Sequence, residues 1–328
     1  MNQKETPASA GKKSRIGPLV FGGLLVPALA LILGFALAGA PRMAAADAAA
    51  PDGGSDALSG GLVWSQAAPG LELGLGMLAE TRSRSPSAMF VVLRFTPSEQ
   101  DLTLEMAREK GASLSPAGWC REAGLRAGIN ASMYLPDKVT STGYMRKDAV
   151  VNNSHVGTRL GAFFVARPRL DGLPAADIIN RGSDGWEQTL DAYAMVVQNY
   201  RILGPEGRLL WKGKGEKHSI AALGKDRQGR MLFLLCQEPV SVERFVDCLN
   251  EFGLEPSALA YVEGGRQAAL FLRIRDGEDE MPPPDLTGAA VYPLPDGKVY
   301  VWRGRRSPIN TPGNPDGPVP NVIGLRMQ

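Results

Sequence analysis

The stretch that decides the fold reads SVERFVDCLNEFGLEPSALAYVEGGRQAALFLRI, from Ser241 to Ile274. Its first part predicts an amphipathic helix over 241–252, because the serine can cap the helix and apolar residues recur on one face. Two short apolar runs, 258–262 and 268–274, then predict strands. Between them Glu263 precedes two glycines, which allow a tight turn. We therefore expect a helix, a strand, a turn and a second strand in succession.

The residues before this stretch are dominated by predicted strands. Each is a short run of small, β-branched or aromatic residues, the composition of buried strands. A further helix is expected at 115–122, where Ser115-Pro116 supplies a cap and a proline in the first turn. The predicted strands are 88–95, 127–134, 161–166, 192–198, 219–223 and 231–236, the last two joined by a hairpin turn. The predicted fold class is α+β: a single mixed, strand-rich α/β domain.

The N-terminus predicts export from the cytoplasm. An uncharged apolar segment, 16–40, follows a basic leader, 1–15. The segment is long enough to cross a bilayer, which takes about 20 residues, whereas a secretory signal has an apolar region of roughly 7 to 15 residues. A transmembrane anchor is therefore favoured over a cleaved signal segment, although the small residues around Ala40 keep cleavage open. We expect an inner-membrane protein with a periplasmic domain, or a secreted protein after cleavage.

The predicted domain organisation follows from a change in composition. Residues 41–85 are rich in Ala, Gly, Ser and Asp and are predicted to form a flexible tether, in which the apolar patch 61–77 has room for one strand. No second linker of this kind appears before 276–285. We therefore expect residues 86–328 to form one domain.

Composition and motifs exclude several classes of function. The formal net charge is +2 with interspersed signs, so nucleic acid is not an expected partner. The chain lacks the short motifs of serine hydrolases, P-loop NTPases, zincins and dinucleotide-binding enzymes. Its two histidines and three cysteines have no metal-site spacing, so we assign no metal ligand and no cofactor. Free thiols are favoured over a disulfide between Cys236 and Cys248.

Polar residues at or inside the predicted strands are the candidates for chemistry. Glu263 follows a strand directly, and Asn130 lies within an apolar strand, where its amide must find partners. Gln198 ends one strand, while His218 and Ser219 begin another. Each has a structural alternative, such as a solvated turn, a bulge amide or a polar strand end. Taken singly, none of these residues decides the function.

Four blocks stand in a fixed order along the chain: 130–134 (NASMY), 198–203 (QNYRIL), 217–223 (KHSIAAL) and 240–265. In order and spacing they resemble blocks of the phosphodiester glycosidase family, which includes the lysosomal uncovering enzyme and many exported bacterial proteins. The resemblance covers about 86–275, and VPNVIGL at 319–325 is a further candidate block.

The resemblance implies an extracytoplasmic glycosidase that hydrolyses a sugar-1-phosphodiester or a related envelope glycan. Glu263 would be the catalytic carboxylate, which activates water or stabilises an oxocarbenium-like centre. Arg266 and His218, with Lys217 behind, would neutralise the phosphate. A divalent cation near Glu263 is compatible with these blocks but not required by them. The implied substrate-binding residues are Asn130, Gln198, His218, Ser219, Gly264, Gly265 and Arg266.

Four departures from the family pattern leave the activity open. Val262-Glu263-Gly264 stands where the family typically reads Leu-Asp-Gly, and glutamate extends the reach by one methylene, ~1.5 Å. Asn199-Tyr200-Arg201 replaces Ser-Gly-Pro, and His218-Ser219 replaces Arg-Asn or Arg-Thr. Arg266-Gln267 replaces small or hydroxyl residues. The alternative function is therefore that of a catalytically lapsed member that binds a glycan or an envelope partner.

Overall fold

The computed structural model describes residues 61–77, 89–204, 207–211, 213, 215–277, 288–306 and 311–327. These residues belong to one compact unit. The predicted leader and the predicted transmembrane or signal segment lie outside the described residues, so export and localisation stay predictions. Within the described ranges, no helix has the length and apolar character needed to cross a membrane.

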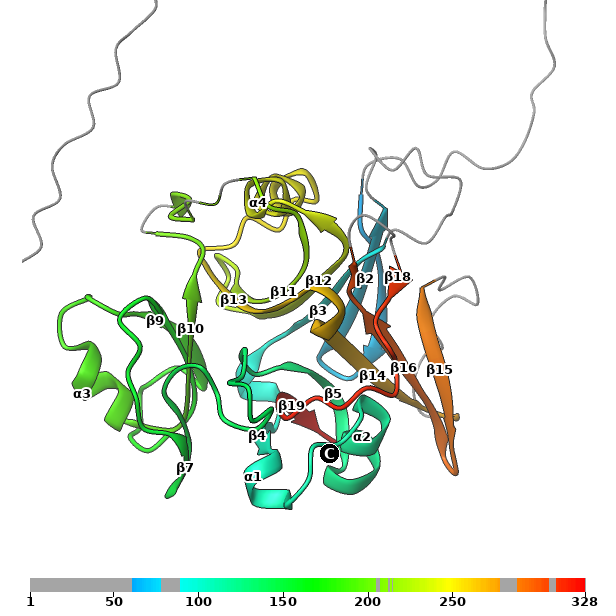
Figure 1. The fold of residues 1–328 in the computed structure, drawn as a ribbon, viewed down its shortest axis with the longest axis horizontal. Coiled ribbons are helices and arrows are strands. Elements are labelled where there is room, and N and C mark those ends of the chain that lie inside the picture. Colours follow the sequence, from blue (N-terminus) through cyan, green and yellow to red (C-terminus); the bar gives the residue numbers. More distant parts are fainter. Residues whose placement is uncertain are drawn as a thin grey trace, which may run out of the picture. The chain divides into compact units, whose positions relative to one another are not determined.

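The described part of the chain is mostly β, with two main antiparallel sheets (Figure 1). The first sheet contains, in order, β1 (Val63–Ala68), β2 (Leu71–Met77), β3 (Met89–Phe95), β12 (Met231–Val240), β11 (His218–Lys225), β13 (Ala258–Gly264), β10 (Tyr193–Arg201), β6 (Met145–Lys147) and β7 (Val150–Asn153), with β8 (Ala162–Pro168) beside β10 and β9 (Ala176–Asn180) beside β8. The second contains β15 (Ala289–Leu294), β16 (Gly297–Arg303), β14 (Ala269–Arg275), β5 (Leu125–Asn130), β19 (Asn321–Arg326) and β4 (Leu102–Met106). A short ribbon consists of β17 (Arg305–Arg306) and β18 (Thr311–Pro312).

Helices are few and short among the described residues. They are α1 (Ala107–Lys110), α2 (Pro116–Ala123), α3 (Trp186–Asp191) and α4 (Val242–Glu251), with 3-10 turns η1 (Pro97–Glu99) and η3 (Gly265–Gln267). The predicted α+β class is therefore wrong, and the fold is mostly β.

Burial of the strands on both faces explains this error. Continuous apolar runs are typical of parallel strands covered on both sides by helices. In β3, Val91 and Leu93 face the second sheet, whereas Phe90 and Val92 face α4. Apart from Arg94 the strand is thus apolar, yet both of its neighbours, β2 and β12, run antiparallel to it.

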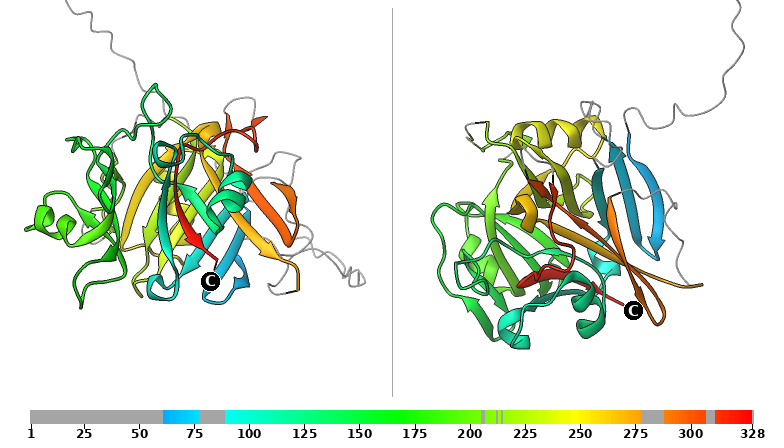
Figure 2. Two further views of the ribbon diagram at one scale, coloured as in Figure 1. Left: turned by 90° about the horizontal axis from the view of Figure 1, so that it is seen from below. Right: turned by 45° about the vertical axis from the view of Figure 1, so that its right-hand side comes forward.

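The core lies between the two sheets, while α4 and α3 pack on the outer face of the first sheet and α2 packs on that of the second (Figures 1 and 2). Phe245 of α4 stacks on Phe90, with ring centroids 5.3 Å apart. On the other side, Trp119 of α2 is fully buried against the second sheet, and its Nε1 donates to Val319 O at 2.8 Å. All three cysteines are free and buried, in line with the favoured state of the thiols.

The stretch from Ser241 to Ile274 folds as predicted. Ser241 caps α4 by accepting a hydrogen bond from Arg244 N at 3.2 Å, and Gly253 follows the helix with a left-handed φ of 70°. The strands β13 and β14 follow, joined by η3. The predicted helix at 115–122 is also confirmed, as α2.

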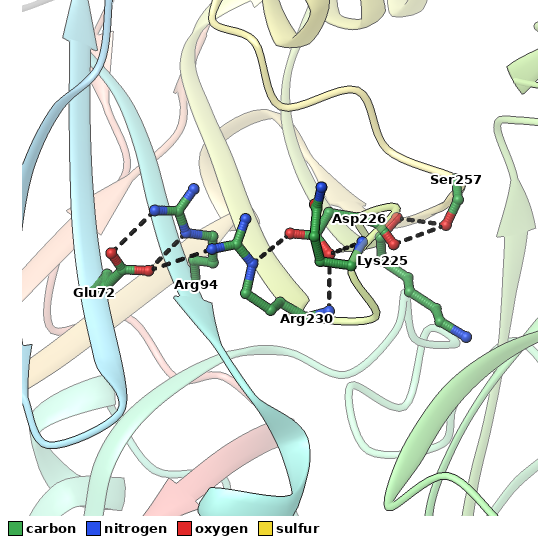
Figure 3. Close-up of polar contacts among 7 residues, drawn as sticks. Glu72, Arg94, Lys225, Asp226, Arg230 and Ser257 are labelled. Carbon is green, nitrogen blue, oxygen red and sulfur yellow. Dashed lines mark hydrogen bonds and ion pairs between the residues drawn. The ribbon is translucent and has the colours of Figure 1, made fainter.

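Residues 63–77, assigned from sequence to the tether with room for one strand, form two strands of the first sheet. Charged side chains attach them to the rest of that sheet (Figure 3). Arg94 of β3 donates to both carboxylate oxygens of Glu72, at 2.7 and 3.0 Å, and stacks on Trp64. Arg230 joins the same network through an ion pair with Glu72 at 4.0 Å, and it donates to Asp226 at 2.7 Å. The folded region therefore includes strands that precede residue 86.

Candidate functional site

Glu263 lies near the end of β13, where a β-bulge decides which face of the sheet it occupies. Ala222 of β11 pairs with Tyr261, but the next residue, Ala221, pairs with Glu263, so Val262 is the extra residue of the bulge. Tyr261 faces α4, whereas Ala221 faces the second sheet. Because cross-strand partners share a face, the bulge turns Glu263 toward the space between the two sheets.

The carboxyl group of Glu263 is buried, with 8% of the residue exposed. Desolvation raises its pKa to about 7, although the hydrogen bond from Gly264 N to Oε1, at 2.9 Å, lowers it. No cation of the described residues forms an ion pair with it. A carboxyl group with a pKa near neutrality can accept or donate a proton under physiological conditions.

The turn after Glu263 is closely packed against a side chain and a neighbouring backbone segment. A Cβ atom at Gly264 would lie 1.8 Å from the hydroxyl oxygen of Tyr261, so a larger residue does not fit. Gly265 has a left-handed φ of 58°, which favours glycine. From the other side, a Cβ atom at Gly304 would lie 2.1 Å from Gly265 O. These glycines define the turn, and the structure therefore assigns them a clear packing role.

Asn130, predicted to bind substrate, holds this turn through its amide. The residue is buried at the end of β5. Its Oδ1 accepts a hydrogen bond from Ala269 N at 2.6 Å, and its Nδ2 donates to Gln267 O at 3.2 Å. The structure thus brings Asn130 next to the turn after Glu263, with both ends of its amide engaged by the backbone.

Gln198 is fully buried, and its amide is saturated by backbone groups. Oε1 accepts from Gly157 N at 2.8 Å and from Tyr144 N at 3.2 Å. Nε2 donates to Gly157 O at 2.9 Å and to Leu160 O at 2.8 Å. An amide offers two donors and one acceptor oxygen with two lone pairs, so no capacity remains for a sugar hydroxyl.

Ser219 and His218 are neighbours in sequence but differ in surroundings. Ser219 is fully buried, and its Oγ lies 2.5 Å from Gln237 O and 2.6 Å from Arg305 N, which donates to it. The side chain of His218 is 58% exposed, and its Nε2 lies 3.8 Å from a carboxylate oxygen of Glu216. Ser219 therefore joins strands, while His218 lies at the surface.

Arg266 is exposed and lines a cavity of about 280 Å³. Two further residues line the cavity, Tyr134 and Arg303, and the sequence did not predict either as a site residue. Burial raises the pKa of Tyr134 and the charge of Glu263 raises it further, whereas Arg303 lowers it. Tyr134 therefore lies within electrostatic range of both Glu263 and Arg303. Its place at the end of the block NASMY was the available signal, whereas no motif marks Arg303.

The described residues contain no group of three or more His, Cys, Asp or Glu side chains that could hold a metal ion. The site is thus built from one carboxyl group, a glycine turn and a neighbouring cavity rich in cationic side chains.

No family model and no curated protein matches the chain. Among solved structures, the catalytic domain of zebrafish N-acetylglucosamine-1-phosphodiester α-N-acetylglucosaminidase, auto-inhibited by its pro-peptide, matches with a TM-score of 0.53 and 11% identity, over 82% of this chain and 89% of that chain. A hypothetical protein from Synechocystis matches with a TM-score of 0.42 and 11% identity, over 72% of this chain and 62% of that chain. An exported protein from Burkholderia pseudomallei matches with a TM-score of 0.37 and 10% identity, over 73% of this chain and 74% of that chain. The described fold is therefore similar to that of the zebrafish catalytic domain, at the level of architecture alone.

Proposed function

We propose that this chain is an extracytoplasmic glycosidase that hydrolyses sugar-1-phosphodiesters or related envelope glycans. The observation that carries the proposal is the buried carboxyl group of Glu263, whose pKa is raised to about 7. The fold supports it, because the zebrafish neighbour is by name a phosphodiester glycosidase. The chain would act from the membrane surface through its predicted anchor, or as a secreted enzyme after cleavage.

Glu263 is suited to act as a general base in this reaction. The leaving group is a phosphate ester, which needs little help from a general acid. The demanding step is the attack of water on the anomeric carbon, and a carboxylate can activate that water. A base whose pKa lies near the working pH combines strong proton affinity with a large ionised fraction. Turnover is therefore expected to rise with pH up to about 7 and then to level off.

A second candidate function is binding without catalysis. It is favoured because the other residues predicted from the sequence to bind substrate are engaged elsewhere in the structure. The side chains of Asn130, Gln198 and Ser219 are occupied by backbone groups. His218 lies at the surface beside Glu216. This arrangement leaves Glu263, the glycine turn and the cavity as the candidate machinery.

The test is the release of phosphomonoester from a panel of sugar-1-phosphodiesters by the full chain, purified in detergent because of its predicted anchor. We expect turnover of at least one member, with a rate that increases between pH 5 and about 7. The Glu263→Gln variant serves as the control for contaminating hydrolases. An absence of turnover across the panel, with retained glycan binding, would replace the enzyme by the binding module.

A further inference from the structure

The cavity beside the glycine turn is lined by three cationic side chains, Lys138, Arg266 and Arg303. None of the described residues that line it is an aspartate or a glutamate. Its volume of about 280 Å³ is at the lower end of the range for small-molecule sites, roughly 300 Å³ and above. Charge and size together suit a small anion.

Arg303, at the end of β16, is the buried member of this set. Only 3% of the residue is exposed. Its Nη1 donates to Gln267 O at 3.3 Å and its Nη2 donates to Gly317 O, while its Nε has no hydrogen-bond partner among the described residues. A guanidinium has five N–H donors, so the two backbone carbonyls leave most of them unused.

Burial without a carboxylate is costly for such a group. Desolvation lowers the pKa of Arg303 to about 10, while the charges of Tyr292, Tyr134 and Asp316 raise it. Asp316 is exposed and, among the described residues, forms no ion pair with Arg303. A buried cation that lacks a counter-ion costs several kcal/mol, and an anion in the cavity would remove that cost.

The two exposed cations stand on separate, well-defined segments around the cavity. Arg266 lies on the glycine turn, whose Gln267 carbonyl is held by both Asn130 and Arg303. Lys138 lies on a loop that Asp137 folds by accepting hydrogen bonds from Val139 N at 3.0 Å and Thr140 N at 2.9 Å. That carboxylate therefore shapes the loop rather than filling the cavity.

We propose that this cavity binds the phosphate group of a phosphate ester, with Arg303 presenting its guanidinium from below and Lys138 and Arg266 closing on the anion from the rim. Arginine binds phosphate through parallel N–H donors, while lysine acts as a point charge. Asn314 and Tyr134, which also line the cavity, offer further hydrogen-bonding groups to the ester oxygens.

The assignment of this phosphate to the substrate rests on the proposed function. Tyr134 lies within electrostatic range of both Arg303 and Glu263. Arg266 follows Glu263 by three positions in the same turn. A phosphodiester seated on the cations would therefore extend its sugar past Tyr134 toward the carboxyl group. Phosphate binding itself can be measured independently of any turnover.

The experiment is calorimetric titration of the full chain in detergent with dimethyl phosphate and with methyl phosphate. Dimethyl phosphate stands for the diester of a substrate, and methyl phosphate for the monoester of a released product. We expect both to bind wild-type protein, and at least about tenfold weaker binding by the double variant Lys138→Gln, Arg266→Gln. The matched control is Arg227→Gln, an exposed cation on the β11–β12 turn, which should leave both affinities unchanged.

A second variant tests the buried group. Arg303→Lys keeps the charge but removes the planar fork, so affinity for both esters should fall although the circular dichroism spectrum is kept. Should this variant fail to fold, the double variant of exposed residues decides alone. Stronger binding of the diester assigns the site to substrate, and stronger binding of the monoester assigns it to product.

The outcomes separate this proposal from the proposed function. Ester binding that depends on Lys138 and Arg266, without turnover of any sugar-1-phosphodiester, would keep the phosphate site and remove the enzyme. Turnover with ester affinities that are equal in wild type and double variant would keep the enzyme and overturn the phosphate site. No binding of either ester by wild-type protein would also overturn it.

Discussion

Replacement of Gln198 by leucine is expected to lower the free energy of unfolding by roughly 3–5 kcal/mol. The amide makes four hydrogen bonds to the backbone, two of them with Gly157 and the others with Tyr144 and Leu160. Leucine removes all four hydrogen bonds. Gly157 O still accepts one from Leu160 N at 3.2 Å, and each buried group that is left without a partner costs about 1–3 kcal/mol. Urea unfolding, monitored by circular dichroism at fixed pH, measures the loss.

Gln228→Leu is the matched control, since Gln228 lies exposed on the β11–β12 turn. It should change stability by less than about 0.5 kcal/mol. A Gln198→Leu variant that is as stable as wild type but has lost substrate affinity would contradict the structural role and restore the ligand-binding role predicted from the sequence.

Glu263→Gln is expected to abolish turnover and, at the same pH, to stabilise the protein. Loss of a general base costs on the order of 10²–10⁴ in rate, and glutamine cannot accept the proton. The same substitution is expected to increase the free energy of unfolding. The pKa of Glu263 rises from 4.5 to about 7 on folding, so the protonated form is favoured in the folded state. Stability is therefore full below about pH 4.5 and falls as pH rises to about 7, by on the order of 3 kcal/mol.

The variant should lack this pH dependence, because its amide does not titrate. Unfolding free energies of wild type and Glu263→Gln, compared between pH 4.5 and 8, should diverge as pH rises, with the variant more stable at pH 8. Glu187→Gln, on the exposed side of α3, should follow wild type at every pH. Parallel curves for wild type and Glu263→Gln would show that the carboxyl group is not held in an apolar environment.

Local signals in the sequence predicted the elements around the site. The serine cap and glycine stop of α4, and the glycine pair after Glu263, each act over a few residues, and all three lie where expected. The proportion of helix to strand was not predictable from such local signals. Strands such as β3 carry apolar residues on both faces, because a helix covers one face and a sheet the other, in an antiparallel arrangement.

The roles of single polar residues depend on contacts that are distant in sequence. The partners of Asn130 lie in the turn before β14, and those of Gln198 lie in loops of another segment. A strand pattern indicates that such an amide is buried, but not whether backbone or ligand satisfies it. The bulge at Val262 is a change of one residue in register, yet it moves Glu263 to the other face of the sheet.

The place of Arg303 in the cavity likewise depends on contacts that are distant in sequence. Arg303 ends a strand whose preceding residues, 299–302, form a continuous apolar run, and its partners lie in the turn after Glu263 and in the segment around Gly317. Only the assembled structure shows that a guanidinium is buried there without a carboxylate partner.

The pKa of Glu263 is the most direct test of its proposed role as a buried base. It can be measured by carbon-13 NMR on protein labelled at the glutamate carboxyl carbon. The signal that is missing in Glu263→Gln assigns the resonance. We expect a titration midpoint of about 7. A midpoint near 4.5, the value of an unperturbed glutamate, would mean a solvated carboxylate and would contradict both the buried site and its proposed role as a base.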